Sequence, residues 1–317
     1  MTVKIITQGL QIQANLSGVA FVNCCKGVAV GAAGTVITTN DGGVSWTSRN
    51  SGYAGSFRDV TFAGASRMVA VGDECVILMS DDEGKTWFAP TTVPSFLDPV
   101  EKNLLAGVNF KDETIGYAVG VLGAEPIPRA VVLTTSDGGN TWSFEFVLPE
   151  FADSIADVAF SNMDGIEYVV VVGGGTTGIG GLIIRAEIGT SNWNIAPSRT
   201  LNELFGVAFA KAPYEKYGWA VGREGTIVHT TDGGATWNVQ ASGKPDELLL
   251  RVAAIDDKHA WAVGINGSLI ATNDGGENWI PQNSNGGQQL LDLSYCCPCL
   301  GTIVGASATV LTVLGRT

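Results

Sequence analysis

Short runs of alternating apolar and polar residues recur along the chain in sets of three. The first run of a set contains a pattern such as GVAF or DVTF, the second reads GWAVG or AWAVG, and the third reads TIVHT or SLIAT. Each run is too short for a helix and is rich in Val, Ile and Thr, so we predict that each forms a β-strand. The first run occurs seven times, at 18–21, 59–62, 107–110, 157–160, 206–209, 251–254 and 292–295.

Five of the sets are followed by an eight-residue Asp box, Ser/Thr-x-Asp-x-Gly-x-(Ser/Thr/Asn)-Trp, after which a fourth strand is predicted. We interpret the box as a hairpin turn, because Gly accepts a positive φ, the Asp carboxylate can accept backbone N–H groups and the Trp can wedge between sheets. Calcium binding by these aspartates is the less favoured alternative. The fourth set reads AEIGTSNW at 186–193, without the Asp, and the seventh set has lost the box. The box residues are Asp41 and Trp46, Asp82 and Trp87, Asp137 and Trp142, Asp232 and Trp237, and Asp274 and Trp279.

Seven sets of four strands predict an all-β fold, a seven-bladed β-propeller with four-stranded blades. The last set supplies three strands before the chain ends, so residues 3–13 are predicted to complete blade seven and close the ring. The repeats run through residues 1–317 without a linker, which predicts a single domain. The blades are expected to begin near residues 16, 57, 105, 155, 204, 250 and 290.

Composition and charge bear on the kind of protein this is and on the partners that it could bind. The protein has 317 residues, 42 of them Gly, with 45% hydrophobic and 15% charged residues, as expected of a turn-rich protein with a sizeable core. Its net charge of −13 disfavours nucleic acid and anionic lipid as partners. The apolar window at 168–184 is interrupted by glycines, which favours buried strands over membrane insertion. No signal-peptide pattern follows Met1, so we expect a protein that is cytoplasmic as synthesised or that enters a larger assembly such as a virion.

Five of the six cysteines fall in turns of blades one and seven, which are predicted to be neighbours. Cys296 and Cys299 have the C-x-x-C spacing that suits a metal ion, to which Cys24 or Cys25 could add a ligand. A disulfide between the two turns is an equally simple arrangement. Without a secretory signal, reduced thiols that behave as small hydrophobes are favoured, so neither a metal nor another cofactor is predicted.

The sequence contains no recognisable catalytic motif. His229 and His259 are its two histidines, and neither lies in a nucleophile or metal-binding pattern. The glycine-rich segment at 173–181 lacks the following helix and the Lys-Ser/Thr pair of a phosphate-binding loop. We therefore predict no catalytic residue and favour a protein that is not an enzyme.

The Asp boxes resemble those of known families. TTNDGGVSW at 38–46 and TTSDGGNTW at 134–142 resemble the bacterial neuraminidase repeat of sialidases, sortilin-type receptors and some glycanases. GWAVGREGTIVHTTDGGATW at 218–237 is similar to the photosystem II assembly and stability factors, a family with phage-encoded relatives. The resemblance implies a β-propeller and a non-catalytic scaffold or adhesion module. Two alternatives stay open, an Asp-box glycoside hydrolase with two catalytic carboxylates and a photosystem II assembly chaperone.

The loop-rich face of the predicted propeller is the expected binding surface, because variable loops on a rigid scaffold commonly carry recognition. A protein or a glycan is the expected partner. A polar ring near the axis could contribute, although solvated strand ends are the favoured interpretation of these side chains. The candidate binding residues are Arg129, Arg199 and Arg223 in the loops and Asp59, Asp157, Arg251 and Asp292 in the first strands.

Overall fold

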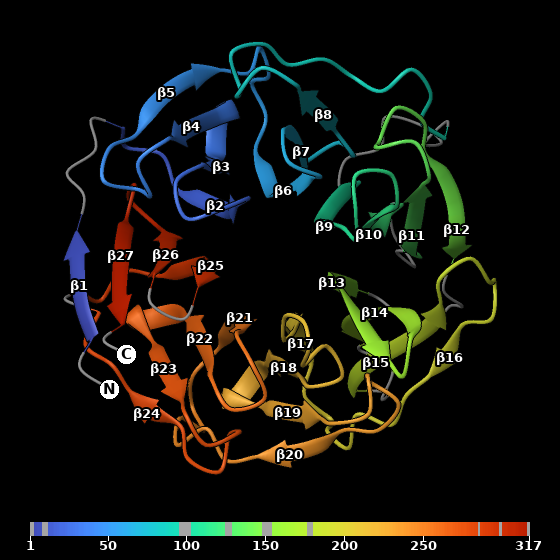
Figure 1. Ribbon diagram of the computed structural model, residues 1–317, viewed down its shortest axis with the longest axis vertical. Coiled ribbons are helices and arrows are strands. Elements are labelled where there is room, and N and C mark those ends of the chain that lie inside the picture. The colour runs from blue at the N-terminus through green and yellow to red at the C-terminus, as the bar shows by residue number, and fades with distance from the viewer. Residues whose placement is uncertain are drawn as a thin grey trace. The chain divides into compact units, whose positions relative to one another are not determined.

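The computed structural model describes residues 3–7, 12–94, 103–123, 129–147, 154–175, 180–284, 286–297 and 300–315. These residues form antiparallel sheets joined by tight turns, and the fold is the predicted all-β, seven-bladed β-propeller (Figure 1). The protein divides into two compact units, Met1–Val147 with Leu291–Thr317, and Leu148–Leu290. The two units are described separately below.

The first unit contains blades one, two, three and seven. Blade one consists of β2 (Leu16–Phe21), β3 (Gly27–Gly31), β4 (Thr35–Thr39) and β5 (Thr47–Asn50). Blade two consists of β6 (Phe57–Ala63), β7 (Arg67–Gly72) and β8 (Ile77–Ser80). Blade three consists of β9 (Leu104–Phe110), β10 (Gly116–Leu122), β11 (Arg129–Thr135) and β12 (Ser143–Val147). Blade seven consists of β25 (Leu290–Cys297), β26 (Leu300–Gly305), β27 (Val310–Gly315) and β1 (Val3–Thr7).

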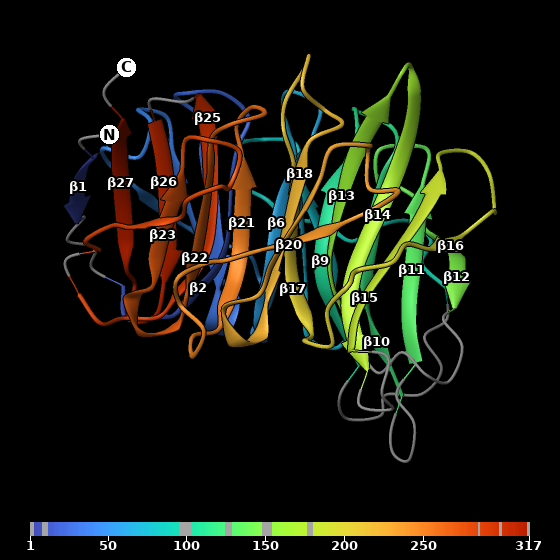
Figure 2. The ribbon, with the colours of Figure 1, turned by 90° about the horizontal axis from the view of Figure 1, so that it is seen from below.

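The second unit contains blades four, five and six. Blade four consists of β13 (Ser154–Met163), β14 (Ile166–Gly175), β15 (Gly180–Glu187) and β16 (Asn194–Ile195), and Figure 2 shows β14 and β15 as a long antiparallel pair. Blade five consists of β17 (Leu204–Phe209), β18 (Gly218–Gly222), β19 (Ile227–Thr230) and β20 (Asn238–Gln240). Blade six consists of β21 (Leu249–Ala254), β22 (Ala260–Gly264), β23 (Leu269–Thr272) and β24 (Ile280–Pro281).

The second strand of each blade lies in the core. All residues of β3, β18 and β22 are buried, because these strands are paired on both edges and packed on both faces. Their continuous Val and Ala content suits a strand that is covered on both sides. The outermost strands are short and mostly exposed, which limits the open sheet edges that could pair with other proteins.

A glycine at the start of the second strand lies under an aromatic ring of the first strand. A Cβ placed on Gly218 would lie 2.6 Å from the nearest Phe209 ring atom, and one on Gly116 would lie 2.6 Å from Phe110. The aromatic ring in turn meets the Asp-box Trp edge-on, with centroids 5.9 Å apart for Phe209 and Trp237. The Gly in GWAVG and GYAVG therefore makes room for the packing of the Trp.

Blade seven is completed by the N-terminal strand, as the sequence predicted. β1 pairs antiparallel with β27, with Val3 opposite Gly315 and Thr7 opposite Leu311. Within the predicted segment 3–13, residues 8–11 lie outside the described part of the protein. This pairing joins the two ends of the sequence in one sheet.

Blade two departs from the predicted four strands. Its fourth strand is reduced to a bridge between Met79 and Phe88. Beyond Pro90 the backbone pairs with blade three instead, since the N–H of Thr91 donates to the Asn140 carbonyl at 2.8 Å and the N–H of Trp142 donates to the Thr92 carbonyl at 2.9 Å. Pro90 has no N–H with which to continue the blade-two ladder.

Candidate functional site

The five predicted Asp boxes form the same hydrogen-bonded turn. In blade five, Oδ1 of Asp232 accepts the Thr236 N–H at 2.9 Å and the Thr230 hydroxyl at 2.8 Å, and Oδ2 accepts the Thr236 hydroxyl at 2.6 Å. Hydrogen bonds from Thr86 lower the pKa of Asp82 to about 2. Both carboxylate oxygens are thus engaged within the turn. Equivalent bonds are made by Asp41, Asp82, Asp137 and Asp274.

The Asp-box tryptophans pack beneath their turns. Nε1 of Trp87, Trp142 and Trp237 donates to the carbonyl of the box Gly at 2.9–3.1 Å. Nε1 of Trp279 donates instead to Oε1 of Gln240 at 3.3 Å, whereas Nε1 of Trp46 is buried and has no partner within the described residues. The boxes therefore have the geometry of structural turns, with the indole as the buried anchor.

The first-strand aspartates join neighbouring blades within each unit. The Asp59 carboxylate accepts the N–H groups of Val60 at 2.7 Å and of Val108 in the next blade at 2.8 Å. Asp157 bonds the N–H groups of Val158 and Val207 in the same way, and Asp292 accepts the Val19 N–H at 2.7 Å. A β-bulge immediately before Asp59 and before Asp157 aims these side chains at the neighbouring blade. These hydrogen bonds show that the first-strand aspartates have a structural role between blades. Their part in partner binding stays a prediction.

Arg251 belongs to the same first-strand position in blade six. Its Nη1 donates to the carbonyl groups of Phe205 and Leu250 at 2.8 and 3.0 Å. Burial raises the pKa of Asp157, and the charge of Arg251 opposes that shift. The glycine of the neighbouring blade is required here, because a Cβ on Gly206 would lie 2.8 Å from the Cα of Arg251.

The three loop arginines occupy different settings. Arg129 is the exposed first residue of β11, in the first unit. In the second unit, Arg223 forms a 3.1 Å ion pair with Glu203, and Nη1 of Arg199 donates to Oδ1 of Asn238 at 2.9 Å. The structure therefore does not gather Arg199 and Arg223 on a shared partner group, and their binding role stays a prediction.

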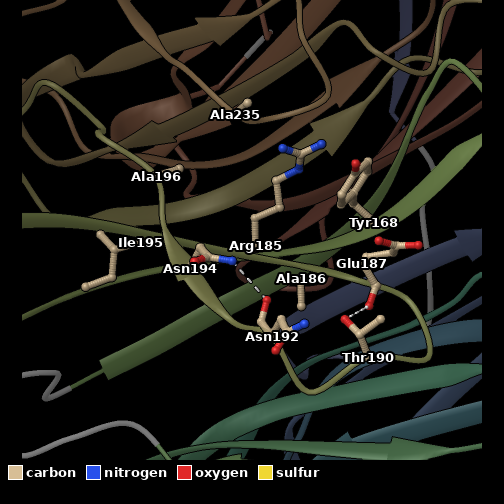
Figure 3. A pocket seen from close by; sticks show the side chains of 10 residues that line it. All are labelled: Tyr168, Arg185, Ala186, Glu187, Thr190, Asn192, Asn194, Ile195, Ala196 and Ala235. Atoms are coloured by element: carbon tan, nitrogen blue, oxygen red, sulfur yellow. Dashed lines mark hydrogen bonds between the residues drawn. The ribbon is translucent and has the colours of Figure 1, made fainter.

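A hollow next to the degenerate box of blade four is a candidate site in the second unit. This blade-four hollow has a volume of about 420 Å³, within the size range of ligand pockets. Its wall follows the backbone where Ala186, Ile188 and Thr190 replace the Thr, Asp and Gly of the box, so no carboxylate-centred turn forms there. Figure 3 shows the lining residues, Tyr168, Arg185, Ala186, Glu187, Thr190, Asn192, Asn194, Ile195, Ala196 and Ala235.

Arg185 and Tyr168 form the polar centre of the blade-four hollow. The guanidinium carbon of Arg185 lies 3.4 Å from the centroid of the Tyr168 ring, and Figure 3 shows the two side chains stacked. Nε of Arg185 is buried and has no hydrogen-bond partner within the described residues. Burial lowers the pKa of Arg185, while the neighbouring charges of Tyr168 and Asp232 and a side-chain hydrogen bond with Tyr168 oppose that shift.

A second hollow adjoins the first at the end of β16. This Leu201 hollow has a volume of about 400 Å³ and shares Ile195 and Ala196 with the blade-four hollow. Leu201 is 83% exposed and Ile195 59% exposed. The remaining lining residues are Gly181, Leu182, Pro197, Ser198, Arg199 and Thr200.

Sequence reasoning missed Arg185, Tyr168 and both hollows. The two side chains meet because β14 and β15 pair in a register that sets Val170 opposite Arg185, and no motif encodes that register. The available signal was the loss of the box Asp at 186–193, which removes a repeated turn element from this blade alone among the first six. By itself, such a loss also fits simple degeneracy of a repeat and does not identify a site.

The cysteine cluster can be placed only in part. Cys24 and Cys25 are exposed free thiols, whereas Cys299 and the side chain of Cys296 lie outside the described residues. Within the described ranges, no three His, Cys, Asp or Glu side chains are grouped so that they could hold a metal ion. A helix of the length and apolarity needed to cross a membrane is likewise not found in that part of the protein.

Comparison with solved structures shows the same fold. YCF48 bound to D1 peptide superposes with a TM-score of 0.73 at 20% identity, covering 99% of this chain and 97% of that one. YCF48 from Cyanidioschyzon merolae gives 0.73 at 23% identity, with 97% and 98% coverage. The WD40 repeats of RRP9 give 0.73 at only 10% identity, with 98% and 97% coverage. No curated protein matches the sequence.

The match to a family model is more specific than the shared fold. The model described as photosynthesis system II assembly factor YCF48 matches residues 3–94 and 185–283, together more than half of the sequence. The second matched range holds β19 and the Asp box of blade five, which carry the repeat pattern most fully. The chain therefore belongs to the YCF48 family of photosynthesis system II assembly factors.

Proposed function

We propose that this protein is a non-catalytic, assembly-factor-like propeller that binds an extended segment of another protein along the outer edge of blade four. Family membership supports an assembly role, and a YCF48 structure has been solved bound to D1 peptide. In an oxygenic host, a photosystem protein is the partner that the family favours.

The observation that carries this proposal is the pair of hollows that meet at β16. β16 is the last strand in the sheet order of blade four and pairs with β15 through Ile195 opposite Ile184. An extended segment can add to such an edge through its backbone and place alternate side chains in flanking hollows. Because both hollows share Ile195 and Ala196, one short segment would be able to reach both.

The recurring acids support a binding role over a hydrolytic one. A glycoside hydrolase of this fold needs a pair of available carboxylates. In this protein the Asp-box carboxylates accept hydrogen bonds of their own turns, as with Asp232 and Thr236, and Asp59 and Asp157 bond neighbouring blades. The repeated acids thus have structural partners, which leaves recognition as the function that the geometry favours.

The test is photocrosslinking from the proposed edge. Benzoylphenylalanine is placed at Ile195, and the tagged protein is irradiated in cells of its source. The matched control carries the same group at Ser48 of β5, which pairs with Ile37 as Ile195 pairs with Ile184. We expect one partner to crosslink at position 195 through a single defined segment, mapped by mass spectrometry, and not at position 48.

The identity of the crosslinked protein separates the assembly and virion alternatives. A photosystem subunit supports the chaperone role, and a capsid or tail protein supports a virion component. Equal crosslinking from positions 195 and 48, or none from position 195, contradicts binding at the blade-four edge.

A further inference from the structure

The guanidinium of Arg185 places a positive charge in the blade-four hollow, and its orientation is fixed by stacking on Tyr168. Arg185 extends from β15 and its guanidinium lies 3.4 Å from the Tyr168 ring centroid (Figure 3). Stacking on an aromatic face limits the rotation of a guanidinium and so prepares its planar fork for a carboxylate. The hollow thus offers an anion-binding group that is already partly ordered, so less side-chain entropy is lost when a ligand binds.

The hydrogen-bond capacity of this guanidinium is not used fully. Nε of Arg185 is buried without a partner among the described residues, and an unmet buried donor on a charged group is unfavourable. Asp232 is the acid whose charge acts on Arg185, but its carboxylate oxygens accept hydrogen bonds from Thr230 and Thr236. A ligand carboxylate in the hollow would therefore bring to the guanidinium an acceptor that these side chains do not supply.

Two other polar side chains of the hollow, those of Thr190 and Asn194, bond backbone carbonyls and not the guanidinium. The Thr190 hydroxyl donates to the Glu187 carbonyl at 2.8 Å, and the Asn194 amide donates to the Asn192 carbonyl at 3.1 Å. Glu187 is the acid of the lining and is exposed, whereas Arg185 is half-buried. The positive charge of Arg185 is therefore more buried in the hollow than the negative charge of Glu187.

The Leu201 hollow is different in character. Leu182, Pro197 and Leu201 give it apolar walls beside the shared residues Ile195 and Ala196. Side chains of an extended segment alternate between two faces, so neighbouring hollows can select residues of different chemistry. The pair of hollows therefore suits one acidic and one aliphatic group.

We propose that the blade-four hollow binds a carboxylate of the partner segment through Arg185, while the Leu201 hollow takes an aliphatic side chain of the same segment. This inference rests on the proposed binding of a protein segment at β16. The carboxylate belongs either to an Asp or Glu side chain or to a free C-terminus, and both present the same group to the guanidinium.

The test uses defined peptide pools. Four fluorescein-labelled pools of twelve-residue peptides contain Leu, Val, Ser, Thr and Gly with either Glu or Gln, and each is made with a free or an amidated C-terminus. Binding is measured by fluorescence anisotropy at physiological salt. The protein's net charge of −13 repels acidic peptides at long range, so a preference for them requires a local site.

We expect the Glu pool, or the free C-terminus if that is the source, to bind about 10-fold more tightly than the uncharged pool. Arg185→Gln and Asn194→Glu should each remove the preference, the latter by placing a carboxylate at the exposed rim of the hollow. Thr47→Glu, at the corresponding exposed position of β5, should retain it. The ¹⁵N-resolved Nε–H resonance of Arg185 should shift with the binding pool.

The outcomes separate the two proposals. Equal affinity for all four pools, together with crosslinking from position 195, overturns carboxylate recognition and leaves binding at the edge intact. Absence of binding by every pool together with no crosslinking from position 195 overturns both. If Arg185→Gln fails to fold by circular dichroism, the exposed Asn194→Glu variant still decides, because loss of the preference supports the proposal and its retention contradicts it.

Discussion

At the scale of single residues, the Asp-box carboxylate explains why the repeat is so strict. Asp232 accepts two hydrogen bonds from Thr236 and one from Thr230, and each requires the residue types of the motif. The residue roles at the repeat positions could therefore be anticipated from the sequence, because their bonds are local. Arg185 could not be anticipated, since it depends on strand register and on the absence of a turn.

Removing one box carboxylate should destabilise the protein measurably. Asp232→Ala deletes three hydrogen-bond acceptor contacts and leaves the Thr236 N–H without its partner, so we expect a loss of about 2 kcal/mol in the free energy of unfolding. Urea denaturation followed by tryptophan fluorescence measures the change. Asp246→Ala, at an exposed position, is the control and should alter stability by less than about 0.5 kcal/mol. Equal effects of the two variants would contradict the structural role of the box.

His229 should make stability depend on pH. Its ring stacks on Trp219 with centroids 4.5 Å apart, Nε2 is buried without a partner within the described residues, and burial lowers the pKa to about 4. The unfolded protein, with a His pKa of about 6.5, binds a proton at higher pH than the folded protein. The free energy of unfolding should therefore fall as pH decreases from about 6.5 to about 4.

The variant His229→Phe isolates this effect. It keeps an aromatic ring against Trp219 and has no titratable group. Its free energy of unfolding should change less between pH 6.5 and pH 4.5 than that of the unaltered protein. The Asp-box acids with lowered pKa values, such as Asp82, lose their contribution only below about pH 3.8 and do not interfere in this range. Parallel pH profiles for the two proteins would show that His229 is not the source.

At the scale of elements, the strands and turns were predictable because each depends on a short, repeated pattern. The closure of blade seven by β1 follows from that pattern, because the last set supplies three strands. The β-bulges before Asp59 and Asp157 were not predicted. Within the described residues, the reduction of the fourth strand of blade two to a bridge was not predictable, because the segment after Pro90 bonds to blade three. Whether a segment pairs with its own blade or with the next one depends on tertiary contacts, which the local sequence does not specify.

The glycine under the first-strand ring is an element-scale requirement. Gly218→Val should cost about 2 kcal/mol or more, because its Cβ would lie 2.6 Å from Phe209 and push the ring against Trp237. Thermal denaturation by circular dichroism measures the loss. Gly286→Ala serves as control, since a Cβ at this position meets no atom within 4 Å. A Gly218 variant as stable as the control would show that the ring can move aside.

Removal of β1 should weaken blade seven. Deleting residues 1–7 exposes the edge of β27, whose residues from Leu311 to Gly315 pair with β1. We expect a lower melting temperature and concentration-dependent association through the open edge, measured by calorimetry and analytical ultracentrifugation. Deleting residues 316–317 is the control and should change neither property. An unaltered, monodisperse protein after removal of β1 would contradict the closure.

At the scale of the whole molecule, fold and family are better determined by sequence than function is. Five Asp boxes and seven sets of strands specify the propeller, and the YCF48 family model matches more than half of the sequence. The proposed partner surface has no repeated signature, because the hollow beside it lies where the repeat is broken in blade four.

The most direct test of binding at the blade-four edge is amide hydrogen exchange of the protein with and without the partner segment identified by crosslinking. We predict increased protection of Asn194 and Ile195 in β16 and of residues 198–201 beside the Leu201 hollow. Protection confined to the first-strand positions Asp59, Asp157, Arg251 and Asp292, with β16 unchanged, would contradict the account.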